Sequence, residues 1–191
     1  IITSIEEIGL VYLDDISIAL DCAASELYQD NSYHLAGEGK KLSSDQMVEY
    51  ITELSKKYEI KSIEDPFDEG DWDSWKKFTK LNDNLQVVGD DIFVTQEEIL
   101  KKGIDENAAN SILVKLNQVG TLSETMRTIS LAKENNFGTV ISHRSGETED
   151  TFISDLAVAV DAKQIKTGAP ARSDRTAKYN RLLIIEDELY P

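Results

Sequence analysis

The sequence is poor in cysteine, in basic residues and in long apolar runs. Its single cysteine, Cys22, excludes an intramolecular disulfide and makes a reducing cytoplasm the expected location. No apolar run approaches the roughly 20 residues that a membrane-spanning helix needs, and we expect no secretory signal. Lysine and arginine number 20 against 36 acidic residues, a net charge of -16. We therefore expect neither nucleic acid nor a membrane as a partner, because both are polyanionic, and favour a small ligand or a cation.

Short β-type runs alternate with stretches of helical periodicity along the whole chain. The runs predict six strands that end near residues 20, 63, 88, 114, 142 and 165, and helices at 44–58, 71–81, 95–102, 121–136, 150–160 and 173–186. We expect Ser44 or Asp45 to cap the first of these helices, Thr95 to cap the third and Gly103 to end it, and Met126 to be buried. Strand and helix in alternation imply parallel strands joined by right-handed crossovers.

Two α/β architectures fit this alternation: an open doubly wound sheet and a (β/α) barrel. A doubly wound dinucleotide-binding sheet carries a glycine-rich phosphate motif after a strand, and the sequence has none. Reactive side chains instead follow nearly every predicted strand, which favours a barrel with its active site at the carboxyl ends of many strands. A complete barrel needs eight strands and about 250 residues. Residues 1–191 are therefore predicted to form one incomplete TIM-type barrel domain.

An ionisable residue follows each predicted strand. These residues are Asp21, Glu64, Asp90, Lys115, His143 with Arg144, and Lys166. Three carboxylates on separate strands are suited to a hard ion such as Mg²⁺, which prefers oxygen ligands. The cations are suited to an anionic substrate, since arginine binds a phosphate or carboxylate through two hydrogen bonds.

Lys115 directly follows a short run of buried-strand residues, 111–114, and two interpretations of it are open. Its stem could lie along the sheet edge with the ammonium in water. Alternatively it could act as a base, because nearby cations and a metal ion make the loss of its proton easier. Such a base would remove a proton from the carbon next to a carboxylate that the metal holds, since the metal stabilises the resulting charge.

Six segments, in this order, closely resemble the enolase family. They are 21–26, 63–69, 88–91, 114–121, 142–150 and 166–170. The resemblance covers nearly the whole chain and implies a lyase of glycolysis, phosphopyruvate hydratase, which reversibly dehydrates 2-phosphoglycerate to phosphoenolpyruvate. A lysine base acting with Mg²⁺ is the established chemistry of the enolase superfamily, so the resemblance implies it here.

The resemblance also implies which residues bind the metal ion and which residue acts as the base. By matching motifs, Asp21, Glu64 and Asp90 would ligate the Mg²⁺ that grips the substrate carboxylate. Lys115 would take the proton next to that carboxylate.

The remaining implied roles concern the substrate. Arg144 and Ser145 would hold its phosphate, and His143 would line the pocket. Lys166 would contact its carboxylate.

Enolases carry an amino-terminal domain and first barrel strands that have no counterpart in this sequence. The glutamate that protonates the leaving hydroxyl and the loops that close over the substrate belong to those parts. We therefore expect the chain to be a fragment that is inactive alone, and the full-length protein to be a homodimer, as enolases typically are.

Two other functions remain open at this point. An aldolase-type barrel would use Lys115 to form a Schiff base with a carbonyl substrate, which borohydride would trap, whereas chelation of Mg²⁺ would inactivate an enolase. A catalytically silent barrel could instead act as a binding module, and an uninterrupted reading frame upstream of Ile1 would argue against it.

Overall fold

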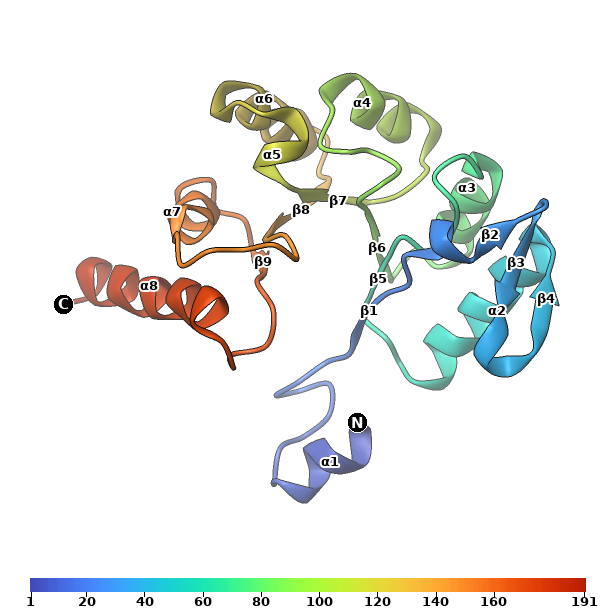
Figure 1. Cartoon of the computed structure of the whole chain (residues 1–191), viewed down its shortest axis with the longest axis horizontal. Helices are drawn as coiled ribbons and strands as arrows, with labels where there is room; N and C mark the ends of the chain where they lie inside the picture. Colours follow the sequence, from blue (N-terminus) through green and yellow to red (C-terminus); the bar gives the residue numbers. More distant parts are fainter. The chain divides into compact units, whose positions relative to one another are not determined.

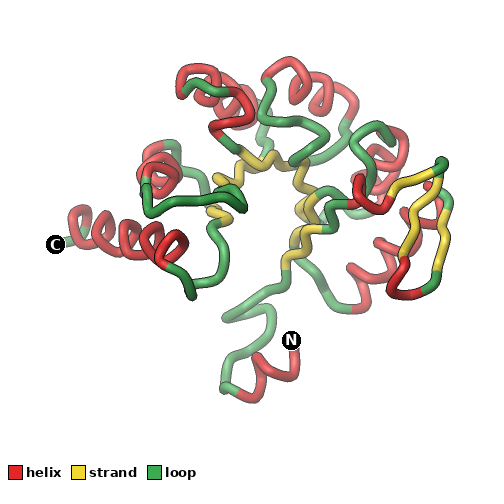
Figure 2. Tube along the Cα trace, in the orientation of Figure 1, coloured by secondary structure: helices red, strands yellow, loops and turns green.

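The computed structural model describes all 191 residues, which form two compact units. The first unit contains residues 1–92 and 103–110, and the second contains residues 93–102 and 111–191. Helices and strands alternate along both units (Figure 1, Figure 2). The alternation confirms the predicted α/β class.

The first unit contains three parallel strands and a small antiparallel sheet. The parallel strands are β1 (Ala19–Asp21), β5 (Ser62–Glu64) and β6 (Gln86–Gly89), in the order β1-β5-β6. The antiparallel strands are β2 (Tyr28–Gln29), β3 (Ser32–Leu35) and β4 (Lys40–Leu42). The helices are α1 (Ile2–Glu7), α2 (Ser44–Lys57) and α3 (Trp72–Leu81), with 3-10 turns η1 (Ala24–Leu27) and η2 (Ala36–Glu38). The crossovers from β1 to β5 and from β5 to β6 therefore contain α2 and α3, as a strand-helix repeat requires.

The second unit contains three more parallel strands, so the two units hold the six that the sequence predicts. These strands are β7 (Ser111–Val114), β8 (Gly138–Ser142) and β9 (Gln164–Lys166), in the order β7-β8-β9. The helices are α5 (Leu116–Val119), α6 (Leu122–Glu134), α7 (Phe152–Ala159) and α8 (Ser173–Leu189). The chain passes between the units three times, and the second of these boundaries, between Lys102 and Gly103, falls within α4 (Glu97–Glu106). No helix combines the length and the apolar character that crossing a membrane requires.

An aromatic cluster forms the core of the first unit between β5 and α3. Phe67, Trp75 and Phe78 are fully buried. The ring of Phe67 meets those of Trp75 and Phe78 edge to face, with centroids 6.1 Å and 5.3 Å apart. The hydroxyl of Tyr33, on β3, donates to the Asp71 carboxylate that caps α3, at 2.8 Å. This bond ties the antiparallel sheet to the helix that packs on the aromatic cluster.

Predicted details at the ends of two helices are wrong. Ser43 caps α2, in place of Ser44 or Asp45, because it forms a capping box: its hydroxyl accepts from the N–H of Gln46 and the Gln46 side chain accepts from the N–H of Ser43. Helix α4 continues through Gly103 to Glu106.

The predicted burial of Met126 is wrong as well. This residue of α6 is 37% exposed, while Ile129 and Ala132 of the same helix are buried. The apolar stripe of α6 is therefore narrower than the sequence suggests.

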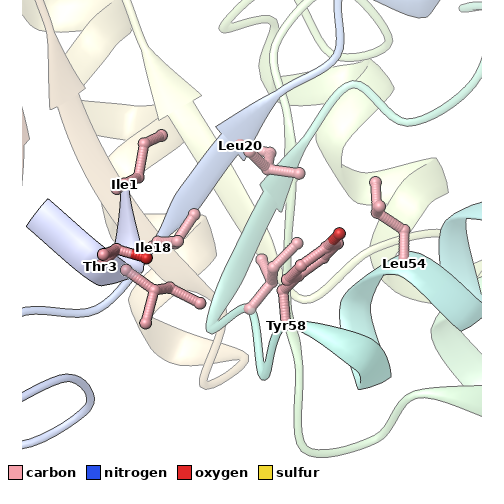
Figure 3. A pocket seen from close by; sticks show the side chains of 8 residues that line it. Ile1, Thr3, Ile18, Leu20, Leu54 and Tyr58 are labelled. Carbon is pink, nitrogen blue, oxygen red and sulfur yellow. The ribbon is translucent and has the colours of Figure 1, made fainter.

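An apolar cleft of about 440 Å³ lies next to β1 in the first unit (Figure 3). Its walls are formed by Ile1, Ile2, Thr3, Ile18, Leu20, Leu54, Tyr58 and Ile60. None of these side chains carries a charge at neutral pH, so the cleft is unsuited to an anionic substrate. It is a patch of apolar side chains in contact with water.

We expect residues 1–191, produced alone, to bind a hydrophobic dye and to aggregate through this cleft and the adjoining edge of β1. The variant Ile18→Ser puts a hydroxyl in the cleft and should lower the dye fluorescence. Met126→Ser is the control, since it removes an exposed apolar side chain far along the chain on α6. Equal fluorescence from the Ile18→Ser variant and the unmodified chain would place the dye elsewhere.

Candidate active site

Three acidic residues lie at the carboxyl ends of adjacent strands in the first unit. The register pairs Asp21, the last residue of β1, with Glu64, the last residue of β5. Partners in register have their side chains on the same face of the sheet, so both carboxylates project from one face. Asp90 directly follows β6, the next strand. The structure therefore brings the three predicted metal ligands to neighbouring strand ends.

Asp65 is a fourth acidic residue at this edge, and the sequence analysis did not identify it. Carboxylate oxygens of Asp65, Asp90 and Asp91 lie within 4.8 Å of one another. The two oxygens of Asp65 accept the backbone N–H groups of Asp90, at 2.8 Å, and Asp91, at 2.9 Å. We interpret Asp65 as a brace that fixes the backbone at Asp90, and each of its oxygens keeps a second lone pair that can face a cation. The structure thus groups Asp90 with Asp65 and Asp91, whereas a metal site formed by Asp21, Glu64 and Asp90 stays a prediction.

The negative potential at this edge is visible in its effect on neighbouring groups. Burial, opposed by the two backbone N–H bonds, raises the pKa of Asp65 to about 7. Burial, followed by the charges of Asp21, Asp65 and Glu64, raises the pKa of Cys22 to about 12. The thiol of Cys22 is therefore protonated at neutral pH and is no nucleophile. A cation bound at this edge would relieve the repulsion among the carboxylates.

The second unit places the predicted base and substrate-binding residues at the ends of its own three strands. Lys115 directly follows β7, His143 directly follows β8, and Lys166 is the last residue of β9. The register pairs Ser142 with Lys166, and the N–H of His143 donates to the carbonyl oxygen of Lys166 at 2.9 Å. The cations thus meet at one edge of this unit because its strands are parallel.

The backbone of Lys115 is held by Thr95. The N–H of Lys115 donates to the Thr95 hydroxyl at 3.0 Å, and that hydroxyl donates to the side-chain oxygen of Gln118 at 2.7 Å. Thr95 is fully buried, so these bonds form away from water. Helix α4 begins at Glu97, two residues after Thr95, so Thr95 does not directly precede the helix as predicted. The side chain of Lys115 leaves the strand from a fixed, extended backbone.

Arg144 and Ser145 lie on an exposed loop that follows β8. The guanidinium of Arg144 donates to the side-chain oxygen of Asn117 at 2.8 Å. Asn117 lies in α5, two residues after Lys115, so Arg144 reaches the segment that carries the predicted base. The N–H of Arg144 donates to Glu147 at 2.9 Å, which closes the loop on itself. The side chains of Arg144 and Ser145 are therefore placed where an anion could reach them.

His143 is held in its neutral form. Its pKa is lowered by partial burial, then by the positive charges of Arg175 and Lys166. Glu147 and a backbone hydrogen bond at Thr167 act in the opposite direction. The sequence analysis did not identify Arg175, because a charged residue in a predicted helix ordinarily faces solvent.

Comparison with known proteins gives two concordant matches. The family model of the enolase C-terminal TIM barrel domain matches residues 1–190. Over all 191 residues the chain is 56% identical to an enolase of Natranaerobius thermophilus, and it spans 45% of that relative's length. These matches confirm the predicted fold, a TIM-type barrel that is incomplete here because the two units hold six parallel strands.

The brace formed by Asp65 can be tested by Asp65→Asn in the full-length protein. The amide has one acceptor oxygen, so one backbone N–H at Asp90 or Asp91 should face an NH₂ group and lose its partner. We expect the free energy of unfolding in urea to fall by about 1–3 kcal/mol.

Asp68→Asn provides the matched control for this substitution. Asp68 accepts the N–H of Gly70 through one oxygen at an exposed turn, and the amide can keep that bond. Its unfolding free energy should change by no more than about 0.5 kcal/mol. Equal losses in the two variants would contradict the assigned role of Asp65.

Proposed function

The chain belongs to the enolase family, and from this membership we propose that the full-length protein catalyses the reversible dehydration of 2-phosphoglycerate to phosphoenolpyruvate. The observation that carries the proposal is the division of strand-end residues. Carboxylates end the three parallel strands of one unit, and a lysine, a histidine with an arginine, and a second lysine end those of the other. Metal binding and anion binding both have suitable residues in this arrangement.

The acidic strand ends would hold Mg²⁺. Asp21, Glu64 and Asp90 supply carboxylate oxygens, which are the ligands that this ion prefers. When bound, the ion stabilises the negative charge that moves onto the substrate carboxylate as the neighbouring proton leaves. Asp65 supports this set from behind by fixing the backbone of Asp90.

The basic strand ends would carry out the proton transfer and hold the substrate. The Nζ atom of Lys115 takes the proton from the carbon next to the substrate carboxylate, and Lys166 contacts that carboxylate. Arg144 and Ser145 bind the phosphate, with the guanidinium of Arg144 already oriented by Asn117. A half-buried, neutral His143 completes the pocket.

The remaining parts of the proposal follow from the family alone. The full-length protein is proposed to be a cytoplasmic homodimer that binds neither nucleic acid nor membrane. Residues 1–191 span 45% of the relative's length, and we propose that they are inactive alone.

Lys115→Ala in the full-length protein tests the assignment of the base. Exchange of the substrate's C2 proton with solvent should fall by at least about 10²-fold, because no other group is proposed to take that proton. Mg²⁺ binding should stay nearly intact, since Lys115 is not a ligand. Lys163→Ala is the control: its side chain is 80% exposed, and exchange should be unchanged. Undiminished exchange in Lys115→Ala would falsify the assignment.

Glu64→Gln tests the metal site through calorimetric titration of the full-length protein with Mg²⁺. Carboxylates about 4 Å apart repel by about 1 kcal/mol even in water, so removing one charge weakens the attraction for the cation while easing the repulsion. We expect the affinity to fall by about 10-fold to 100-fold, as losses at metal sites commonly do. The affinity of the unmodified protein should also fall as pH decreases through the carboxylate range, because protons compete with the ion.

The control for this titration is Glu69→Gln, which neutralises an exposed carboxylate five residues further along the chain. Its Mg²⁺ affinity should match that of the unmodified protein. An unchanged affinity in Glu64→Gln would remove Glu64 from the metal site.

A further inference from the structure

The loop from His143 to Thr148 is held from below by two buried cations of α8. Arg175 and Lys178 are 8% and 0% exposed, and they lie three residues apart, hence on the same face of the helix. Fully buried cations are rare unless their charge and their donors are satisfied. Here nearly all of their partners come from this one loop.

The guanidinium of Arg175 contacts three consecutive residues of the loop. Its Nη1 donates to the Nδ1 atom of His143 and, at 2.8 Å, to the carbonyl oxygen of Arg144. Its Nη2 donates to the carbonyl oxygen of Ser145 at 3.0 Å. Its Nε lies 3.2 Å from the carboxylate of Asp174, which balances its charge. The guanidinium can make all of these contacts because it is planar and carries five N–H donors.

Lys178 holds the far end of the same loop. Its Nζ lies 2.9 Å from the Glu147 carboxylate, donates to the carbonyl oxygen of Thr148, and donates to that of Asp174 at 2.6 Å. Burial would raise the pKa of Glu147, but the bonds from Lys178 and from the N–H of Arg144 lower it overall. Glu147 therefore remains a carboxylate that links Lys178 to the backbone of Arg144.

The contact with Arg175 fixes the tautomer of His143. Arginine has only donors, so the Nδ1 atom that it contacts must be unprotonated. The neutral ring then carries its single proton on Nε2. The lowered pKa of His143 agrees with this state, and the groups that act on it are Arg175, Lys166 and Glu147 together with the backbone at Thr167.

Gly168 leaves room for the side chains of Arg175 and His143 because it has no Cβ atom. A Cβ atom on Gly168 would lie 2.9 Å from its Cδ atom and 3.1 Å from the Cε1 atom of His143. Gly168 also has a φ of +86°, a backbone angle that residues other than glycine rarely adopt. The glycine, the arginine and the histidine thus form one packed group.

From these contacts we propose that Arg175 is a positioning residue of the active site. It turns the carbonyl oxygens of Arg144 and Ser145 inward, so that their negative ends face a buried cation and not a bound anion, and it keeps the proton of His143 on Nε2. The role in turnover rests on the proposed function, whereas the geometry of the loop and the state of His143 do not. The substrate class concerned is a phosphate monoester held by Arg144 and Ser145.

The experiment compares Arg175→Ala, Arg175→Lys and a control, Arg172→Ala, in the full-length protein. Arg172 pairs with the same carboxylate, Asp174, but its side chain is 71% exposed. Three quantities are measured: the ring ¹⁵N shifts of His143 against pH, the affinity for inorganic phosphate by calorimetry, and KM and kcat for 2-phosphoglycerate. Thermal unfolding of each variant identifies any that fails to fold.

In Arg175→Ala we expect the ¹⁵N shifts of both ring nitrogens to approach an average, because neither tautomer is enforced. The pKa of His143 should rise, since a neighbouring positive charge is lost. Phosphate affinity should fall, and KM should rise, on the order of 10²-fold, the effect of misplacing binding groups by about 1 Å. Arg175→Lys keeps the charge without the fork and should give intermediate values, while Arg172→Ala should match the unmodified protein.

Guanidinium at millimolar concentration should partly restore phosphate binding to Arg175→Ala, which a merely misfolded variant would not show. If Arg175→Ala does not fold, the comparison rests on Arg175→Lys. A folded Arg175 variant with an unchanged His143 tautomer and unchanged phosphate affinity would overturn the proposal. Absence of dehydration activity in the unmodified protein would instead overturn the proposed function, and the ring shifts would still decide the role of Arg175.

Discussion

Every group assigned a chemical role here depends on the parallel pairing of short strands. Parallel register brings carboxyl ends to one edge, so residues separated by about forty positions, such as Asp21 and Glu64, become neighbours. The same constraint brings His143 and Lys166 together in the second unit. An antiparallel pairing would place successive strand ends at opposite edges and separate these groups. The strands contribute Asp21, Glu64 and Lys166 as their last residues, and they determine where the loops that carry the other groups begin.

A second set of polar residues lies beneath these strand ends and is largely buried. Asp65 accepts the backbone N–H groups of Asp90 and Asp91. The hydroxyl of Thr95 accepts the N–H of Lys115. Arg175 donates to the carbonyl oxygens of Arg144 and Ser145. Each of these groups costs free energy to remove from water unless all its bonds are made. Their contacts are to the backbone, and backbone contacts fix the origin of a side chain without using its functional atoms. These contacts thereby fix the backbone from which the side chains of Asp90, Lys115 and Arg144 extend.

The sequence predicted the six strands and the residues that end them because each signal is local. An apolar run followed by an ionisable residue needs no knowledge of distant contacts, which is why Lys115 and Lys166 could be identified. Arg175 could not be, since a charged residue on a helix predicts exposure and only the fold shows its burial. Thr95 and Gly103 were misassigned as helix ends because distant contacts and helix length are not local signals. The hydroxyl of Thr95 bonds to the segment that contains Lys115 and Gln118, and α4 passes through Gly103.

Net charge is a poor guide to the local charge at the strand ends of each unit. The chain carries a charge of -16, yet the residues at the ends of β7, β8 and β9 are basic and surround a loop held by two further cations. Exposed charges beyond about 10 Å are screened at ordinary ionic strength, so an anion near these strand ends senses mainly the groups in contact with it. Asp21, Asp65 and Glu64 produce the opposite local field, which adds to the effect of burial in raising the pKa of Cys22. Binding a divalent cation there would reduce that field, because its charge offsets the charges of the carboxylates.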